Sequence, residues 1–252
     1  MGREFRTTAT VIGKTKLGES DMIVRLLSDD GSLVEAVAKG ARKPQNALSS
    51  RLELLNHVEV LLHEGKSLDI VKDCRLIADM GSIGGDPFSL SSAAVMAEFM
   101  TKTAQRDLCV PRLHDLLRMG LSSLGSSQQA YQLASSASVL LKGSAILGFR
   151  PQLASCVSCG APIDGEAPRT MVSFEDGGYL CDGCLGFSSA VPVGTDTVMW
   201  SQWLIANPFS AIQDSMLDDQ TALDIFDFAV SWAENIFDMR LKSAKSLRAY
   251  LQ

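Results

Sequence analysis

The segment Met22-Ile23-Val24-Arg25-Leu26-Leu27 is followed by the turn sequence Asp29-Asp30-Gly31 and then by Leu33-Val34-Glu35-Ala36-Val37-Ala38. Both apolar segments have the length and composition of β-strands, and alternate side chains of the second would share one face. Glycine accepts the positive φ of a tight turn, so the residues between the two segments predict a hairpin. We therefore expect the chain to begin with paired β-strands.

Three further strands are expected in the same region, over residues 8–12, 57–62 and 68–77. Alternation is clearest at Val58, Val60 and Leu62, whose side chains would lie on one face. A five-stranded Greek-key barrel that binds oligonucleotides is the description of the OB-fold, although other small barrels share this number of strands. The strand pattern therefore predicts a small barrel over residues 1–80, for which an OB-fold DNA-binding domain is one candidate.

The periodicity becomes helical after Gly81, Gly84 and Gly85, and Asp86 followed by Pro87 is typical of a helix start. Apolar side chains then recur at spacings of three and four residues, which predicts a helical domain over residues 81–252 and an α+β protein. The stripes are Ala93, Met96, Met100 and Ala104; Leu113, Leu116, Leu117, Leu121 and Leu124 after Pro111; and Ile225, Phe228, Trp232, Ile236 and Met239, with another helix expected over 128–147.

The chain of 252 residues is 46% apolar, so it can bury a substantial core, and its net charge is -6. Such an acidic balance normally argues against a nucleic-acid binder, because phosphate binding needs local positive charge. Residues 1–80 contain 12 Lys and Arg and 12 Asp and Glu, so the remaining residues carry the whole excess. The first third of the chain could therefore still present a basic face.

No run reaches the roughly 18 apolar residues of a membrane span, and residues 1–6 lack the apolar core of a signal peptide. We expect a cytoplasmic protein without a membrane segment. In a reducing compartment, six cysteines are not expected to form a disulfide framework. Cys74 and Cys109 stand alone and are expected to be small buried apolar residues.

The other four cysteines form two C-x-x-C pairs, Cys156-Val157-Ser158-Cys159 and Cys181-Asp182-Gly183-Cys184. Two such pairs supply the four thiolates of tetrahedral zinc and leave no open position for water. We expect one structural Zn²⁺ held by Cys156, Cys159, Cys181 and Cys184 in a finger over residues 153–187. The alternatives are unrelated cysteines and two redox-active pairs, which would need a thioredoxin-like strand and helix context that is not visible.

Two segments partly match catalytic motifs, but neither match is complete. His57-Val58-Glu59 matches the H-x-E of zinc deaminases, but their second element is P-C-x-x-C, and here Leu180 precedes Cys181. Gly81-Ser82-Ile83-Gly84-Gly85 lacks the Lys-Ser/Thr of a phosphate loop. A zinc-dependent hydrolase would need an open metal position and a general base. We therefore expect a protein that is not an enzyme.

A basic loop, Lys39-Gly40-Ala41-Arg42-Lys43-Pro44, follows the third expected strand. Lys and Arg neutralise phosphates and release counterions, Gly40 permits close approach of the backbone, and Pro44 stiffens the exit. Phe5 is the one aromatic residue before residue 80, so backbone contacts are expected instead of base stacking. The predicted DNA contacts are Lys39, Arg42 and Lys43, extended on charge alone to Lys14, Lys16, Arg25 and Arg51; a merely solvated loop is the alternative.

Along nearly its whole length the chain resembles RecO, a family of bacterial recombination mediators. The similarity includes Thr10-Val11-Ile12-Gly13, Leu17-Gly18-Glu19-Ser20-Asp21 and the basic loop. It is most specific at Leu147-Gly148-Phe149-Arg150-Pro151-Gln152-Leu153, which leads into Cys156-Val157-Ser158-Cys159-Gly160.

The resemblance implies an N-terminal OB-fold, a helical C-terminal domain and, in zinc-bearing members, a finger made by the two cysteine pairs. It also implies binding of single- and double-stranded DNA, strand annealing, and loading of recombinase onto DNA coated by single-strand-binding protein. RecR, often RecF, and the acidic, apolar tail of single-strand-binding protein would be partners, in the cytoplasm and at the nucleoid. A protein-binding adaptor without direct DNA contact is the competing hypothesis.

Overall fold

The computed structural model of the chain describes residues 2–43, 46–79, 86–125, 128–186 and 189–251. These residues divide into two compact units, Met1–Arg118 and Met119–Gln252. The expected boundary at residues 80 and 81, with Gly81, Gly84 and Gly85, lies outside the described residues. The first compact unit continues past that position and includes the helix that begins at Pro87.

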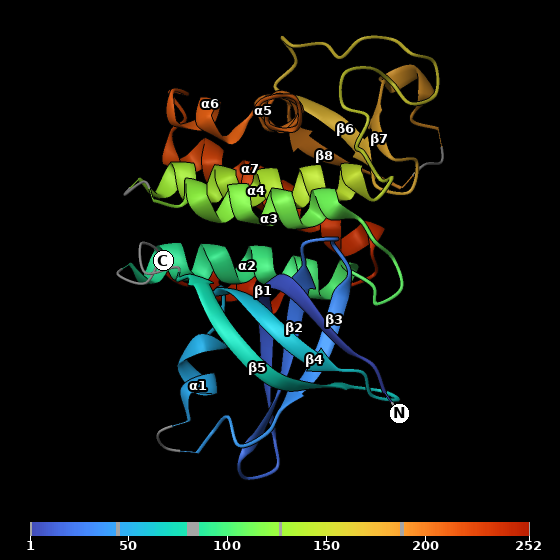
Figure 1. Ribbon diagram of the computed structural model, residues 1–252. Helices are drawn as coiled ribbons and strands as arrows, with labels where there is room; N and C mark the ends of the chain where they lie inside the picture. Colours follow the sequence, from blue (N-terminus) through green and yellow to red (C-terminus); the bar gives the residue numbers. More distant parts are fainter. Residues whose placement is uncertain (1, 44–45, 80–85, 126–127, 187–188, 252) are drawn as a thin grey trace. The chain divides into compact units, whose positions relative to one another are not determined.

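The first unit contains a closed five-stranded barrel with the strand order β1-β2-β3-β5-β4 (Figure 1). All neighbouring strands are antiparallel except β3 and β5, which are parallel. This topology confirms the expected OB-fold barrel. The strands are β1 (Glu4–Leu17), β2 (Asp21–Ser28), β3 (Leu33–Ala38), β4 (His57–His63) and β5 (Asp69–Ala78), with the short helix α1 (Ala47–Arg51) between β3 and β4.

Strand β1 closes the barrel and is much longer than the five residues expected. Its first part, Glu4 to Thr10, pairs with β4, and its second part, Ala9 to Leu17, pairs with β2. A shift of register between Val11 and Gly13 separates the two stretches. The expectation covered only the apolar centre of β1, because charged residues and threonines occupy both of its ends.

The barrel core follows from strand alternation. Val58, Val60 and Leu62 of β4 are fully buried, as predicted, together with Val24 and Leu26 of β2. Gly31 adopts φ +79° in the turn between β2 and β3, which confirms the predicted hairpin.

Helix α2 (Pro87–Thr103) begins as the sequence predicts, because the Asp86 carboxylate accepts hydrogen bonds from the backbone N–H groups of Phe88 and Ser89. Its apolar face is buried, and the hydroxyl of Thr101 donates to the carbonyl of Ile12 in β1 at 3.1 Å. The next helix is α3 (Pro111–Ser123), whose predicted leucine stripe is also buried.

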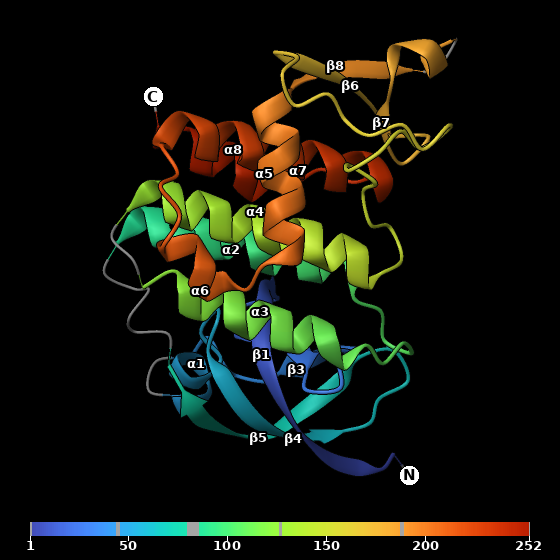
Figure 2. The same ribbon diagram turned by 90° about the horizontal axis from the view of Figure 1, so that it is seen from above.

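The second unit consists of helices packed with a three-stranded sheet of order β7-β6-β8 (Figures 1 and 2). Helix α4 packs against α7, and α5 packs against both. The elements are α4 (Gln129–Ile146), β6 (Arg169–Ser173), β7 (Gly178–Leu180), the 3-10 helix η1 (Asp182–Cys184), β8 (Ala190–Gly194), α5 (Thr195–Ala206), α6 (Phe209–Gln213), α7 (Asp219–Ile236) and α8 (Lys242–Arg248).

Trp232 of α7 is the largest fully buried side chain of this unit. Its indole N–H donates to the carbonyl of Phe149 at 3.3 Å, so its polar edge is satisfied. Met239 was expected on the same helical face, but α7 ends at Ile236, and that part of the expectation is wrong. Within the described residues, no helix combines the length and the apolar character that crossing a bilayer requires.

Candidate metal centre and nucleic-acid interface

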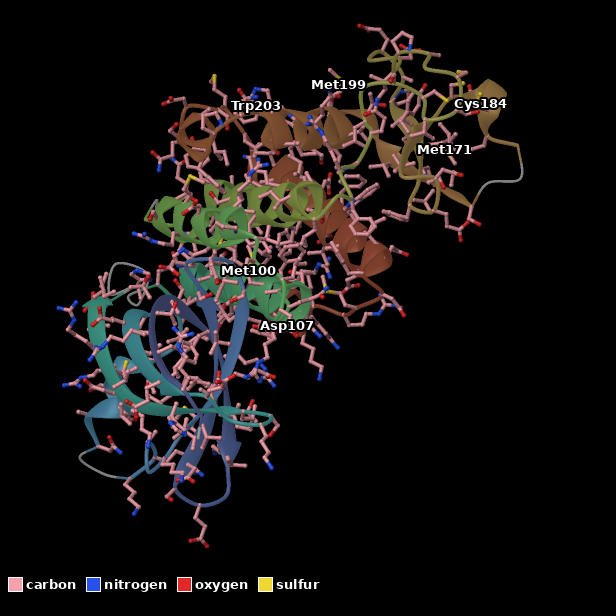
Figure 3. The ribbon with its side chains drawn as sticks, turned by 45° about the vertical axis from the view of Figure 1, so that its right-hand side comes forward. Met100, Asp107, Met171, Cys184, Met199 and Trp203 are labelled. Carbon is pink, nitrogen blue, oxygen red and sulfur yellow. The ribbon has the colours of Figure 1, made fainter. Side chains whose placement is uncertain are left out.

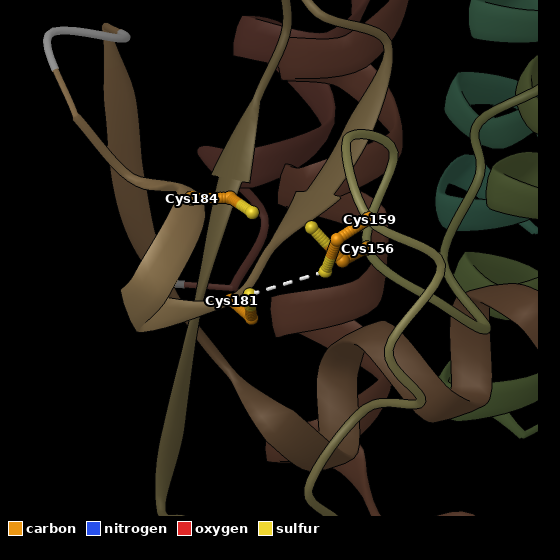
Figure 4. A group of neighbouring side chains, drawn as sticks. All are labelled: Cys156, Cys159, Cys181 and Cys184. Atoms are coloured by element: carbon orange, nitrogen blue, oxygen red, sulfur yellow. Dashed lines mark hydrogen bonds between the residues drawn. The ribbon is translucent and has the colours of Figure 1, made fainter.

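The sulfur atoms of Cys156, Cys159, Cys181 and Cys184 all lie within 4.8 Å of one another (Figure 4). The Sγ atoms of Cys159 and Cys181 are 3.6 Å apart, and all four thiols are free of disulfides. Tetrahedral zinc with Zn–S bonds of about 2.3 Å separates its sulfurs by about 3.8 Å. The predicted ligand set therefore lies together, in a geometry that fits one metal ion.

Two backbone turns present the thiols. In the first, the N–H of Cys156 donates to the carbonyl of Ala161 at 2.7 Å, and Gly160 closes the turn at φ +77° with a bond to the carbonyl of Cys156. In the second, the N–H of Cys184 donates to the carbonyl of Cys181 at 2.9 Å. The N–H of Val157 donates to the carbonyl of Tyr179, which ties the first turn to the strand that precedes the second.

A close backbone contact holds the finger on its sheet. Gln152 accepts a hydrogen bond from the N–H of Tyr179 and donates one to the carbonyl of Gly177. A Cβ atom on Gly178 would lie 2.1 Å from the carbonyl oxygen of Gln152, so only glycine fits there. The hydrophobic cluster around the cysteines is small, with Cys156, Tyr179 and Leu180 as its buried members. Metal binding would therefore supply much of the finger's folding free energy.

The surroundings of the thiols shift their pKa values in opposite directions. Backbone N–H groups of Cys181 and Cys159 lower the pKa of the Cys156 thiol to about 6. A hydrogen bond with Cys159, followed by burial, raises the pKa of Cys181 to about 12. Four thiolates at these distances repel one another, so all four can ionise together only around a positive ion.

Lys39, Arg42 and Lys43 lie together in the loop between β3 and α1, and all three are exposed. The loop is built onto the turn between β1 and β2: the Arg42 guanidinium donates to the carbonyl of Gly18, and the Arg42 backbone N–H to that of Ser20, both at 2.9 Å. Pro44, expected to stiffen the exit of the loop, lies outside the described residues.

An acidic residue that was not predicted to have a role supports the basic loop. The carboxylate of Asp21 accepts a hydrogen bond from the N–H of Gly40 at 2.8 Å. This bond lowers the pKa of Asp21, with smaller contributions from Ser20, Lys39 and Lys43. Gly40 itself adopts φ +65°, which explains why glycine occupies the start of the loop.

The other four predicted cations have different surroundings. Lys14 pairs with Glu53 at 2.7 Å and Arg25 with Glu35 at 2.8 Å. Arg51 donates to the carbonyl of Cys74 at 2.7 Å and has Asp73 at 4.0 Å. Lys16 is exposed and, within the described residues, forms no ion pair; the register places it opposite Met22, which in turn lies opposite Ala38, next to Lys39. A DNA role for all seven cations stays a prediction.

The two lone cysteines and His57 lie outside the four-cysteine cluster. Cys74 is buried, as expected, whereas Cys109 is exposed, with its thiol 3.4 Å from a carboxylate oxygen of Asp30, so the expectation of a buried Cys109 is wrong. His57 is not part of the four-cysteine cluster, which is the one group of three or more metal-ligating side chains found among the described residues.

The chain thus joins in sequence a closed OB-fold barrel with a basic loop and a helical unit that carries a four-cysteine cluster. Family models cover both parts of the chain. The model described as "Recombination protein O N terminal" matches residues 1–80, and the one described as "Recombination protein O C terminal" matches residues 84–245.

Curated relatives agree with these matches. A protein of Dehalococcoides mccartyi named "DNA repair protein RecO" is 31% identical over 210 residues, which is 83% of this chain and 81% of the relative. A protein of Bifidobacterium longum with the same name is 32% identical over 180 residues, 71% of this chain and 73% of the relative. The chain belongs to the RecO family of DNA repair proteins.

Proposed function

We propose that the protein is a DNA repair and recombination mediator that binds single- and double-stranded DNA and anneals complementary strands. It would also help to load recombinase onto DNA coated by single-strand-binding protein. The observation that carries the proposal is the exposed triplet of Lys39, Arg42 and Lys43, held on an OB-fold barrel by hydrogen bonds to the β1–β2 turn. Family membership supports it.

In this proposal the protein has no catalytic activity. It works with RecR, with RecF as a candidate further partner, and with the tail of single-strand-binding protein, which the helical domain would receive. It would act in the cytoplasm, at the nucleoid. The metal would be one structural zinc ion held by Cys156, Cys159, Cys181 and Cys184. When bound, zinc would supply a closed four-sulfur coordination that stabilises the finger, and no step of DNA handling would take place on it.

A protein-binding adaptor is the second candidate. The first compact unit contains 16 Lys and Arg and 16 Asp and Glu, so it has no excess of positive charge. Lys14 and Arg25 are moreover paired with carboxylates. An adaptor would use the barrel to contact protein alone, and exchange of the loop cations would leave its DNA affinity unchanged.

The deciding experiment replaces Lys39, Arg42 and Lys43 together with alanine and measures binding of fluorescent single-stranded DNA at several salt concentrations. Each phosphate neutralised on a single strand contributes about 0.7 to the slope of log affinity against log salt, so three contacts contribute about 2. We expect the variant to bind all sequences more weakly and its salt slope to flatten by about 2 units. Its melting temperature should stay near that of the wild type, because exposed charges contribute little to folding.

The matched control replaces three exposed barrel cations that lie outside the seven predicted DNA contacts, Arg6, Lys72 and Arg75. This control should retain most of the DNA affinity and of the salt slope. Wild-type affinity, annealing and salt dependence in the loop variant would instead favour the adaptor.

A further inference from the structure

Helix α5 has two faces of different character. Val198, Ser201 and Leu204 are buried on the side that packs against α4 and α7. The opposite side presents Asp196, Met199, Trp200 and Trp203, which follow one another at helical spacing. Met199 and Trp203 can be followed along α5 in Figure 3. We call these four residues the α5 aromatic face.

The α5 aromatic face forms a hollow of about 230 Å³ that these four side chains line. The ring centroids of Trp200 and Trp203 are 5.3 Å apart, and the rings are inclined by 75°, so the edge of one indole meets the face of the other. Both indoles are only partly buried, and Met199 is 47% exposed. A helix that exposes two tryptophans and a methionine presents an unusual amount of apolar surface to solvent.

One carboxylate lines this hollow, and two more belong to the segment beside it. Asp196 belongs to its lining and is exposed. The segment with the exposed residues Asp164 and Glu166 lies beside it, because a Cβ on Gly165 would be 3.8 Å from the sulfur of Met199. The cation–π contacts found within the described residues involve Phe209 and Phe226, not these indoles. The indole faces therefore have an acidic rim and no cation over them in the described part of the chain.

The signs of these charges restrict the ligand. At this hollow, DNA and an acidic peptide would both be repelled by the carboxylates of Asp196, Asp164 and Glu166. Indole faces attract cations through their quadrupole, and a nearby carboxylate adds a charge-assisted hydrogen bond. A ligand that combines a guanidinium or ammonium group with an apolar side chain would match both properties.

We propose that the α5 aromatic face is a docking site for a partner protein segment in which a lysine or arginine stands beside apolar side chains. The cation lies against the indoles of Trp200 and Trp203 with Asp196 as its counter-ion, and an apolar neighbour contacts Met199. This site is separate from the proposed DNA contacts, so either proposal can fail alone.

The test measures, by calorimetry, the binding of a probe peptide to the full-length protein. The probe is a synthetic hexapeptide amide that alternates leucine and arginine. We expect the Trp203→Leu variant, which keeps an apolar side chain but loses the aromatic face, to bind the probe about tenfold more weakly, about 1.4 kcal/mol. Trp203→Phe should retain most of the affinity, and Asp196→Asn should weaken binding about threefold at low salt. Met216→Ala removes a fully exposed methionine outside the face and is the matched control, expected to have no effect.

Three outcomes would overturn the proposal. In the first, the protein binds the probe and a version with glutamate in place of arginine equally well. In the second, the Trp203→Leu and Trp203→Phe variants bind the probe equally well. In the third, Met216→Ala weakens binding as much as Trp203→Leu does. DNA binding by the same variants is measured in parallel and should stay at the wild-type level. A loss of DNA binding with retained peptide binding would mean that the DNA site extends here and that the peptide specificity lies elsewhere.

Discussion

At the scale of single residues, the sequence identifies side chains that act through their own chemistry and misses those that act through position. The two C-x-x-C pairs can be recognised directly in the sequence, and the structure brings their four sulfur atoms together. Asp21 supports the basic loop only because the fold brings it to Gly40, nineteen positions away, and no local pattern indicates that contact. Gly178 is likewise ordinary in the sequence, although the carbonyl of Gln152 leaves no room for a side chain.

Gly178→Ala should therefore unfold the finger more easily. The added Cβ would lie 2.1 Å from the carbonyl oxygen of Gln152, so the backbone must move and lose hydrogen bonds. We expect a loss of about 1–3 kcal/mol, measured as faster reaction of the four thiols and a lower melting temperature. Gly183→Ala is the control in the same finger, because a Cβ there meets nothing within 4 Å. Equal effects of the two changes would contradict the steric explanation.

At the scale of elements, predictions from periodicity succeeded where one face of an element is apolar and the other is polar. They succeeded for β4 and for the leucine stripe of α3. Periodicity gave no prediction for α5, whose outer face is aromatic, so that no polar stripe reveals the helix. It gave none for β6, β7 and β8 either, because three to five residues are too few for a period and the pairing is not local.

A histidine pair where β1, β4 and α3 meet should make stability depend on pH. The ring centroids of His57 and His114 are 5.5 Å apart, and the Thr10 hydroxyl lies 3.4 Å and 3.5 Å from their ring nitrogens. Burial lowers the pKa of both histidines, and the positive charge of Arg118 lowers both further. The negative charge of Asp29 raises both pKa values, but by less. At His114 the neighbouring His57 also lowers the pKa, and Asp115 raises it.

Since both histidines prefer to be neutral in the folded state, the unfolded chain binds more protons below its own histidine pKa of about 6.5. The contribution to stability is complete above that pH and is lost as the pH falls through it. We expect the melting temperature to fall by a few degrees between pH 8 and pH 5. Replacing both histidines with glutamine should reduce this fall, and His63→Gln, which changes the remaining histidine, should not. An unchanged pH profile in the double variant would rule the pair out as its cause.

At the scale of the whole molecule, sequence resemblance correctly predicted the order of barrel, helices and four-cysteine finger. It could not predict how charges combine in three dimensions. Of the seven cations proposed for DNA, Lys14 and Arg25 are neutralised by carboxylates on neighbouring segments, a fact that only the fold reveals. The extension by charge alone is thus the weakest part of the predicted DNA site, and the loop triplet is the strongest.

Elemental analysis of protein purified without chelator should give one zinc per chain. Changing Cys156 and Cys181 to serine should abolish zinc binding and destabilise the finger, because metal-binding free energy becomes folding free energy. Cys74→Ser and Cys109→Ser are the matched controls and should keep the metal, since neither belongs to the cluster. Zinc near zero with all six thiols free in the wild type would exclude the assignment, and another metal would correct it.

The dual pairing of β1 has a consequence for the order in which the barrel forms during synthesis. The second half of β1 meets β2 within a few residues, so this hairpin forms as soon as both strands leave the ribosome. The first half must wait for β4, about fifty residues later in the chain, and until then presents an open strand edge. Glu4 and Arg6 place charges on that waiting edge, where they discourage pairing with a second nascent chain.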